Sequence, residues 1–132
     1  GVIDELTPWY DRLLEADLWV IGSPVYNYNI TSWMKAFVDR LYCFYDFGEG
    51  HPRPWSARLA GLGKRVITFV VGEQTDREDI GFAPEALTKP LTALGLESLG
   101  SFVFTGYFGP DALEEDYERV ARFRSNIARA VG

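Results

Sequence analysis

Three short stretches of the chain are almost continuously apolar, at residues 18–23, 65–71 and 101–108. The first ends in turn residues, and the second is closed by Gly72. A strand that is covered on both faces reads as such an unbroken apolar run, whereas a half-exposed strand alternates. We therefore predict three buried β-strands at these positions.

Apolar residues at helical spacing precede the first predicted strand, follow it, and return at the end of the chain. The residues that share these faces are Leu6, Tyr10, Leu13 and Leu14, then Trp33, Phe37, Leu41 and Phe44, then Leu113, Tyr117, Val120, Ile127 and Val131. Pro84 is expected to open a further helix, in which Pro90 predicts a kink or a late start. Asp111 and Glu114 resemble a capping box, so we expect the last helix to begin there.

Strands that alternate with helices indicate a parallel sheet with helices on its faces, which is a three-layer αβα arrangement. The chain has 132 residues, about one domain by the usual ~100–200 residues per domain. It shows no internal repeat or linker. We therefore expect residues 1–132 to form a single α/β domain. Residues 48–63 form a long connection, and residues 72–81 a polar loop.

Charge and composition exclude several classes of function. The chain carries 13 basic and 19 acidic side chains, a net charge of -6, whereas nucleic-acid binding normally needs a basic surface. No apolar run approaches the ~20 residues that span a membrane, and no signal peptide is visible. We therefore expect a cytoplasmic protein without nucleic-acid or membrane partners.

Cysteine and histidine are too rare to build a metal site of the usual kind. Cys43 is the only cysteine and His51 the only histidine, so neither an internal disulfide nor a metal cluster is predicted. Cys43 lies in a helical pattern, where we expect it to be buried. His51 is expected to be a solvated loop residue.

The residues after the first strand are the best candidates for a binding site, because ligands of open α/β sheets bind beyond the carboxyl ends of the strands. They are Pro24, Val25, Tyr26, Asn27, Tyr28 and Asn29. The tyrosine rings could cover a heterocycle, and the asparagine amides can read its donors and acceptors. The residues alone leave a second interpretation open, in which the tyrosines are ordinary half-buried aromatics in a turn. No nucleophile elbow or dinucleotide fingerprint is present, so no catalytic side chain is predicted.

Two sequence blocks carry a family resemblance. Residues 16–26 begin with Ala-Asp and end with Gly-Ser-Pro-Val-Tyr, and residues 34–41 read Met-Lys-Ala-Phe-Val-Asp-Arg-Leu. In composition and spacing the blocks closely resemble the NAD(P)H-dependent FMN reductase and iron–sulfur flavoprotein group of the flavodoxin superfamily. The resemblance implies a flavodoxin-like fold, of which this chain holds the third, fourth and fifth strands. It also implies FMN as cofactor and NAD(P)H as co-substrate.

The resemblance also assigns residues to the flavin ring. Those that it implies are Pro24, Val25, Tyr26 and Asn27 for direct contact, largely through the backbone, Tyr28 and Asn29 as further lining, and Gly72 and Glu73 on the opposite side. Lys35, Asp39 and Arg40 match the family motif as well, but we interpret them as scaffold, because an ion pair and packing explain them.

The implied activity is that of an FMN-dependent NAD(P)H oxidoreductase. Hydride passes from NAD(P)H to the flavin N5, and electrons then reach a flavin, a quinone or another acceptor. The cofactor carries this chemistry, so no side chain need act as acid or base. The alternative is a non-catalytic flavodoxin-like electron-transfer or interaction module, or a truncated fragment that binds no flavin.

One part of the family pattern is not found. The family holds the FMN phosphate in a Ser/Thr/Gly-rich loop at a helix N-terminus, whereas residues 1–16 match the helix before the family's third strand. We therefore expect a longer parent or an obligate oligomer, and weak FMN binding by the present chain alone. The strand at residues 18–23 would then have a bare edge, which a missing N-terminal segment or a second copy in an oligomer must cover.

Overall fold

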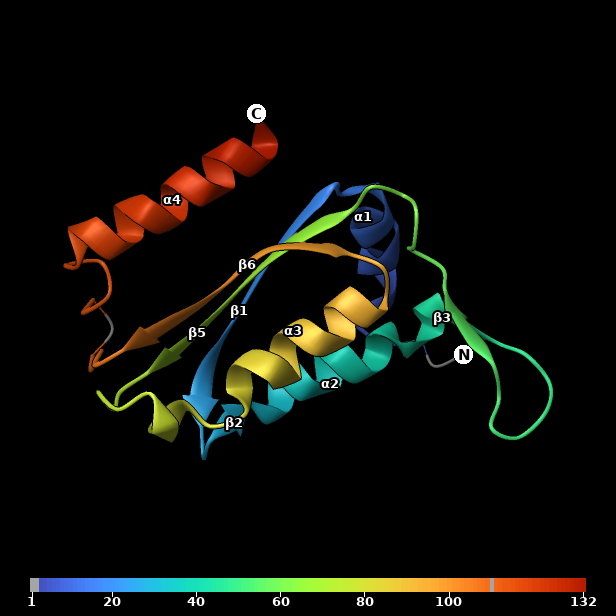
Figure 1. The fold of residues 1–132 in the computed structure, drawn as a ribbon, viewed down its shortest axis with the longest axis horizontal. Coiled ribbons are helices and arrows are strands. Elements are labelled where there is room, and N and C mark those ends of the chain that lie inside the picture. The colour runs from blue at the N-terminus through green and yellow to red at the C-terminus, as the bar shows by residue number, and fades with distance from the viewer. Residues whose placement is uncertain (1–2, 110) are drawn as a thin grey trace.

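A computed structural model describes residues 3–109 and 111–132 of the chain (Figure 1). The helices are α1 (Tyr10–Glu15), α2 (Ser32–Arg40), α3 (Ala83–Ala93) and α4 (Tyr117–Val131). The strands are β1 (Leu18–Tyr26), β2 (Asn29–Ile30), β3 (Tyr45–Phe47), β4 (Trp55–Ala57), β5 (Arg65–Gly72) and β6 (Glu97–Thr105). Short 3-10 turns lie at Thr7–Trp9, Leu41–Phe44 and Glu78–Ile80. In the part of the chain described, no helix is long and apolar enough to cross a membrane.

The main sheet has the strand order β2-β1-β5-β6, in which β1, β5 and β6 run parallel. Leu18 lies opposite Arg65, and Pro24 lies opposite Val71. β2 adds a two-residue antiparallel strand at the end of β1. A helix lies in each crossover between parallel strands, so the predicted α/β class with a parallel sheet is confirmed.

Helices cover both faces of the sheet, as Figure 1 shows. α2 and α3 lie on one face, where Trp19, Val66 and Leu91 belong to one buried cluster. α4 lies on the other face, where the Phe123 ring meets the Phe69 ring edge-on with centroids 5.2 Å apart. The three-layer αβα arrangement is therefore confirmed.

The β1 strand is paired along its length on one side only. β5 pairs with residues 18–24 of β1, whereas β2 meets the other side only at Val25 and Tyr26. Among the described residues, the rest of that edge of β1 has no strand partner. Val20, within this part of β1, is 42% exposed. The bare edge expected from the sequence is thus present in the described part of the chain.

The first strand and the last helix differ from their predicted limits. β1 continues to Tyr26 because β2 folds back and pairs with its end. α4 begins at Tyr117, where the Asp116 side chain accepts a hydrogen bond from the backbone N–H of Arg119. The predicted cap at Asp111 is wrong, because that residue only closes a turn through its carbonyl.

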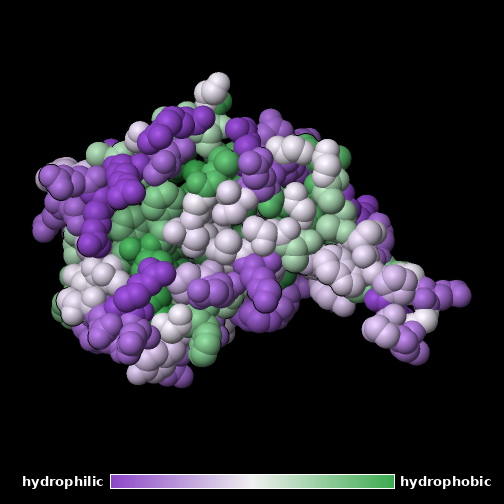
Figure 2. Space-filling view, viewed as in Figure 1, coloured by the Kyte–Doolittle hydropathy of each residue, from purple (hydrophilic) through white to green (hydrophobic). Residues whose placement is uncertain are grey.

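The long connection at residues 48–63 also contains regular structure. β3 and β4 form a hairpin in which Phe47 lies opposite Trp55. The polar tip of this hairpin projects from the body of the molecule (Figure 2). His51 in this tip is exposed, as predicted.

Cys43 is exposed, so its predicted burial is wrong. α2 ends at Arg40, and a 3-10 turn follows. In a 3-10 turn, residues three apart share a face. Leu41 and Phe44 therefore take the buried face together, which turns Cys43 outward.

α3 begins at Ala83 with Pro84 in its first turn, as predicted, and runs on through Pro90 to Ala93. The late start that Pro90 predicted is therefore wrong. The side chains of Leu87 and Leu91 on either side of Pro90 are fully buried. Their packing offsets the hydrogen bond that proline cannot donate.

β6 begins earlier than the predicted 101 and ends at Thr105. Its start is fixed by a backbone hydrogen bond of 2.9 Å from Glu97 N to Lys64 O, at the residue just before β5. Glu97, Ser98 and Gly100 interrupt the apolar pattern at the start of this edge strand. The predicted run therefore began only at Ser101.

Candidate functional site

The end of β1 forms a tight hairpin with β2 at the carboxyl edge of the sheet. Tyr26 lies opposite Asn29, so only Asn27 and Tyr28 form the turn. Both have positive φ, 51° for Asn27 and 65° for Tyr28. Two consecutive left-handed residues are typical of a two-residue hairpin turn, for which asparagine is well suited. Tyrosine is not, so neighbouring contacts must hold Tyr28 in place.

Those contacts come from the start of α3. The backbone N–H of Phe82 donates to the Tyr28 carbonyl at 2.8 Å. Gly81 has a φ of +58°, and a Cβ added there would lie 2.4 Å from the same carbonyl oxygen. Only glycine therefore allows the two segments to approach so closely. The hairpin is fixed against the segment that follows β5.

Ser23 links the hairpin to the start of α2. Its side chain is 2% exposed, and its hydroxyl accepts from the backbone N–H of Thr31 at 3.2 Å while it donates to the Pro24 carbonyl at 2.9 Å. The Thr31 hydroxyl in turn accepts from the N–H of Met34 and caps α2. β1, the hairpin and α2 are thus held in one geometry.

The loops after β5 and β6 are joined at the same edge. Gly106 N donates to Gln74 O at 2.9 Å, and Tyr107 N donates to Gly72 O at 3.3 Å. These bonds place residues 72–74 beside the end of β6, while the pairing of Pro24 with Val71 places the start of the same loop beside the end of β1. The carboxyl ends of the three parallel strands therefore form one connected surface, as this class of sheet requires for a ligand site.

A cavity of about 330 Å³ lies in this surface. Its lining consists of Val25, Asn27, Tyr28, Gly72, Glu73, Gln74, Asp79 and Ile80. The structure therefore brings together five of the residues assigned to the site by resemblance, from both of the segments expected.

The other three residues of the expected set do not line this cavity. Pro24 and Tyr26 are exposed beside it, and the Asn29 side chain accepts from the neighbouring N–H of Ile30 at 2.8 Å. The expected set in turn lacks Gln74, Asp79 and Ile80. The sequence could have indicated Ile80, because it is a lone apolar residue in a polar loop. The structure shows it to be 1% exposed.

The polar groups of the cavity are free to bind a ligand. The side chains of Asn27, Tyr28 and Glu73 form no hydrogen bond or ion pair with any other described residue. Tyr28 is 55% exposed, and Trp33 and Phe82 at the starts of α2 and α3 are exposed at the same edge. No group of His, Cys, Asp and Glu able to hold a metal ion occurs among the residues described. Amides, a carboxylate and aromatic rings suit a planar heterocycle better than a metal ion.

A polar clamp holds α4 to this edge. The Tyr107 hydroxyl donates to Asp116 Oδ2 at 2.5 Å, and Arg119 Nη1 donates to the same hydroxyl at 3.2 Å. Burial and the bond to Asp116 raise the pKa of Tyr107. The hydrogen bonds from Tyr107 and from the Arg119 backbone lower the pKa of Asp116.

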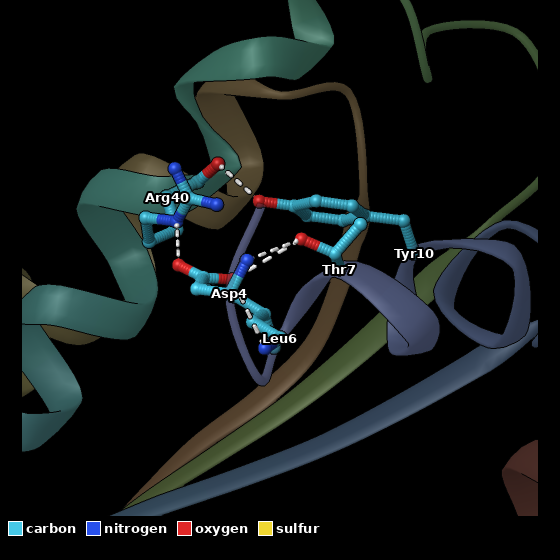
Figure 3. Close-up of polar contacts among 5 residues, drawn as sticks. All are labelled: Asp4, Leu6, Thr7, Tyr10 and Arg40. Carbon is cyan, nitrogen blue, oxygen red and sulfur yellow. Dashed lines mark hydrogen bonds and ion pairs between the residues drawn. The ribbon is translucent and has the colours of Figure 1, made fainter. Parts of the chain in front are cut away.

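The charged residues of the second sequence block lie away from the cavity. Lys35 and Asp39 pair with each other one turn apart on α2. Arg40, at the far end of α2, pairs through Nε with Asp4 Oδ2 at 2.9 Å, and its carbonyl accepts from the Tyr10 hydroxyl (Figure 3). This geometry agrees with their interpretation as scaffold.

The Asp4 carboxylate is stabilised in its charged form. Desolvation acts to raise its pKa, but the N–H of Leu6, the Arg40 guanidinium and the Thr7 hydroxyl lower it overall. Asp4 thereby ties the segment before α1 to the end of α2.

Comparisons with known proteins agree with this geometry. Residues 5–127 match a family model described as a flavodoxin-like fold. An iron–sulfur flavoprotein of Archaeoglobus fulgidus is 30% identical over 88% of this chain and 47% of its own length. An FMN-dependent NADH:quinone oxidoreductase of Methylorubrum populi is 34% identical over 79% of this chain and 53% of its own length. The chain thus spans about half the length of these curated relatives.

A solved structure supports the fold alone. A protein described as a thermophilic tryptophan halogenase from Streptomycin violaceusniger matches with a TM-score of 0.63 at 17% identity, over 94% of this chain and 73% of its own. The parallel sheet, the carboxyl-edge cavity and the match over residues 5–127 lead to one conclusion. The chain belongs to the flavodoxin-like fold family.

Proposed function

We propose that this chain is the ring-binding part of an FMN-dependent NAD(P)H oxidoreductase that reduces a flavin, a quinone or a similar acceptor. The observation that carries the proposal is the cavity in which Val25, Asn27 and Tyr28 meet Gly72 and Glu73. The relatives named as FMN-dependent NADH:quinone oxidoreductases support the same activity and favour NADH as the donor.

The residues present fit a flavin ring. The cavity of about 330 Å³ lies within the ~300–1,000 Å³ of small-molecule sites. Val25 and the buried Ile80 offer an apolar surface, and Asn27 offers an amide donor and acceptor for the polar edge of the ring. Tyr26 and Tyr28 stand exposed beside it and can cover a ring face.

When bound, FMN would supply the hydride-accepting and electron-transferring chemistry. The chain's own residues then bind and orient the ring and shield it from water. The locked hairpin holds Asn27 and Tyr28, and the bonds between the loops after β5 and β6 hold Gly72 and Glu73. No side chain acts as acid or base in this proposal.

The bare edge of β1 belongs to the same proposal. Unpaired N–H and C=O groups on an apolar strand invite pairing with another strand. We propose that residues 18–23 are covered by an N-terminal segment of a longer parent or by a second copy of the chain. Light scattering on the purified chain and on the parent distinguishes these two: only a second copy doubles the mass of the present chain. A cytoplasmic location is part of the proposal and is tested by cell fractionation.

The proposed activity is tested by adding FMN to the purified protein and then NADH or NADPH without oxygen. Bleaching of the flavin colour by either donor supports an oxidoreductase. Colour without bleaching would support an electron carrier instead, and no binding at all would support a fragment that holds no flavin.

A matched pair of variants tests the site itself. Asn27→Gly removes the free amide of the cavity while keeping the positive φ of the turn, and should weaken FMN binding by about two- to tenfold. Asn126→Ala removes an exposed amide on α4, which bonds only the Arg122 carbonyl, and should leave FMN binding unchanged. Equal effects of the two substitutions would contradict the placement of the site.

A further inference from the structure

A second cavity lies at the other end of the molecule. Its volume is about 400 Å³, and it is an open pocket bordered by the C-terminal halves of α2 and α3 and by the β3–β4 hairpin. Figure 1 places this hairpin far from the carboxyl ends of β1 and β5. The cavity is therefore separate from the proposed flavin site, and the inference drawn from it does not rest on the proposed function.

Aromatic rings form the walls of this cavity. Tyr42 and Phe47 stack with centroids 5.1 Å apart and planes at 25°. Tyr45 meets Trp55 edge-on at 5.2 Å and 87°. At the base of the cavity lies Leu94, which is 1% exposed and belongs to the packed core. Aromatic rings beside a packed core residue suit a flat, apolar ligand.

Stability of the hairpin explains only part of this arrangement. A hairpin with three-residue strands needs cross-strand aromatic pairs, and the contact of Tyr45 with Trp55 and the pairing of Phe47 with Trp55 supply them. Tyr42 lies outside the hairpin strands and is 62% exposed, yet it lines the same cavity. The small residue Ala93 leaves the space on the α3 side open. Tyr42 also stacks on Phe47 and so supports the hairpin, but its exposed ring and the open space beside Ala93 leave room for a further molecule.

The polar groups around the cavity limit the charge of a ligand. At the mouth, Lys35 and Asp39 neutralise each other. Inside, the Tyr45 hydroxyl donates only a long bond of 3.5 Å to the Pro90 carbonyl. Burial, with a smaller contribution from Tyr42, raises the pKa of Tyr45, so its hydroxyl stays protonated at neutral pH. One neutral donor is thus available to a ligand.

We propose that this cavity binds an uncharged planar aromatic molecule of about two fused rings that carries a hydroxyl or carbonyl group. The rings lie against the aromatic cluster of Tyr42, Tyr45, Phe47 and Trp55, beside Ala93 and Leu94 of the α3 side, and the polar group meets the Tyr45 hydroxyl. The volume of about 400 Å³ accommodates such a molecule.

The test uses 2-naphthol as the probe, with binding measured by calorimetry and by the NMR signal of the Trp55 indole. Ala93→Phe fills the cavity, and Trp55→Ala removes a wall. Each should weaken binding by about tenfold or more. Trp33→Ala removes an 87% exposed tryptophan at the N-terminal start of α2, away from this cavity, and should leave binding unchanged.

A second probe pair tests the polar anchor. Tyr45→Phe should weaken the binding of 2-naphthol by about threefold or more and leave that of naphthalene unchanged. The proposal is overturned if 2-naphthol does not bind, or if Trp55→Ala and Trp33→Ala reduce binding equally. Self-association that buries this hairpin, seen as a doubled mass that Trp55→Ala restores to a monomer, would also overturn it. Because Trp55 is 56% exposed and its contacts are local to the hairpin, its substitution leaves the main sheet intact even if Ala93→Phe does not.

Discussion

The two hairpins that flank α2 are held together in opposite ways. The β1–β2 hairpin has a two-residue turn and is locked from outside, by Phe82, Gly81 and the Ser23 hydroxyl. The β3–β4 hairpin has a long tip and is held by its own aromatic rings. The first therefore depends on distant residues for its shape, whereas the second is almost self-contained. This difference suits the proposed flavin site at one end and a pocket shaped by local aromatic contacts at the other.

The largest effect is expected from closing the space beside Tyr28. Gly81→Ala would place a Cβ 2.4 Å from the Tyr28 carbonyl, at a φ of +58°, and should lower the free energy of unfolding by about 2–4 kcal/mol. Gly61→Ala is the control, since Gly61 has a φ of +78° but a Cβ added there would meet nothing within 4 Å beyond its chain neighbours. This substitution should lower the free energy of unfolding by only about 1 kcal/mol. Urea unfolding measures both. Equal losses would show that the hairpin is not locked at Gly81.

A smaller loss is expected from the link between β1 and α2. Ser23→Ala leaves the buried N–H of Thr31 without its acceptor and should lower the free energy of unfolding by about 1–2 kcal/mol. Ser125→Ala on α4 removes an exposed hydroxyl and should change it by less than about 0.5 kcal/mol. A neutral Ser23→Ala variant would contradict the role of this hydroxyl in fixing the site.

Trp55→Ala should destabilise the β3–β4 hairpin without disturbing the carboxyl edge. Its global cost is expected to be about 1 kcal/mol or less, because the side chain is 56% exposed and its contacts are local. Hydrogen exchange should speed up in β3 and β4 and stay unchanged in β1 and β2. Faster exchange at Tyr26–Asn29 would show that the two hairpins are coupled.

The pH dependence of the α4 clamp gives the smallest expected effect. The pKa of Asp116 is lowered in the folded protein, so its contribution to stability is present above the unfolded value near pH ~4 and is lost as the pH falls through the folded value. Tyr107→Phe removes the main hydrogen bond that lowers this pKa, and should flatten the acid side of the stability profile. An unchanged profile would show that Asp116 does not contribute to the pH dependence of stability. Tyr117→Phe, at an exposed ring next to the cap, is the control.

The meeting of Val25 with Gly72 could be predicted, because the carboxyl ends of neighbouring parallel strands lie together. The shape of the turn at Asn27 and Tyr28 could not. A left-handed tyrosine has no local signal, and it depends on Gly81, which lies far along the chain.

The β3–β4 hairpin and the cap of α4 were concealed for other reasons. Strands of three residues are too short to show a period, and the loop of Gly, Pro and Arg between them reads as a plain connection. At α4, the Asp111–Glu114 spacing imitates a capping box, whereas Asp116 is selected by its bond to Tyr107. In both cases a side-chain contact across the chain decided the local structure.

The most direct test of the ring-binding site compares FMN with lumiflavin, which has the flavin ring without the phosphate, by NMR titration of the 132-residue chain. Both are expected to bind weakly, with affinities within about threefold of each other. The shifted amide signals are expected to be those of residues 25–29 and 72–74. Tight binding of FMN alone, or shifts at the β3–β4 hairpin and none at these residues, would contradict this placement of the ring-binding site.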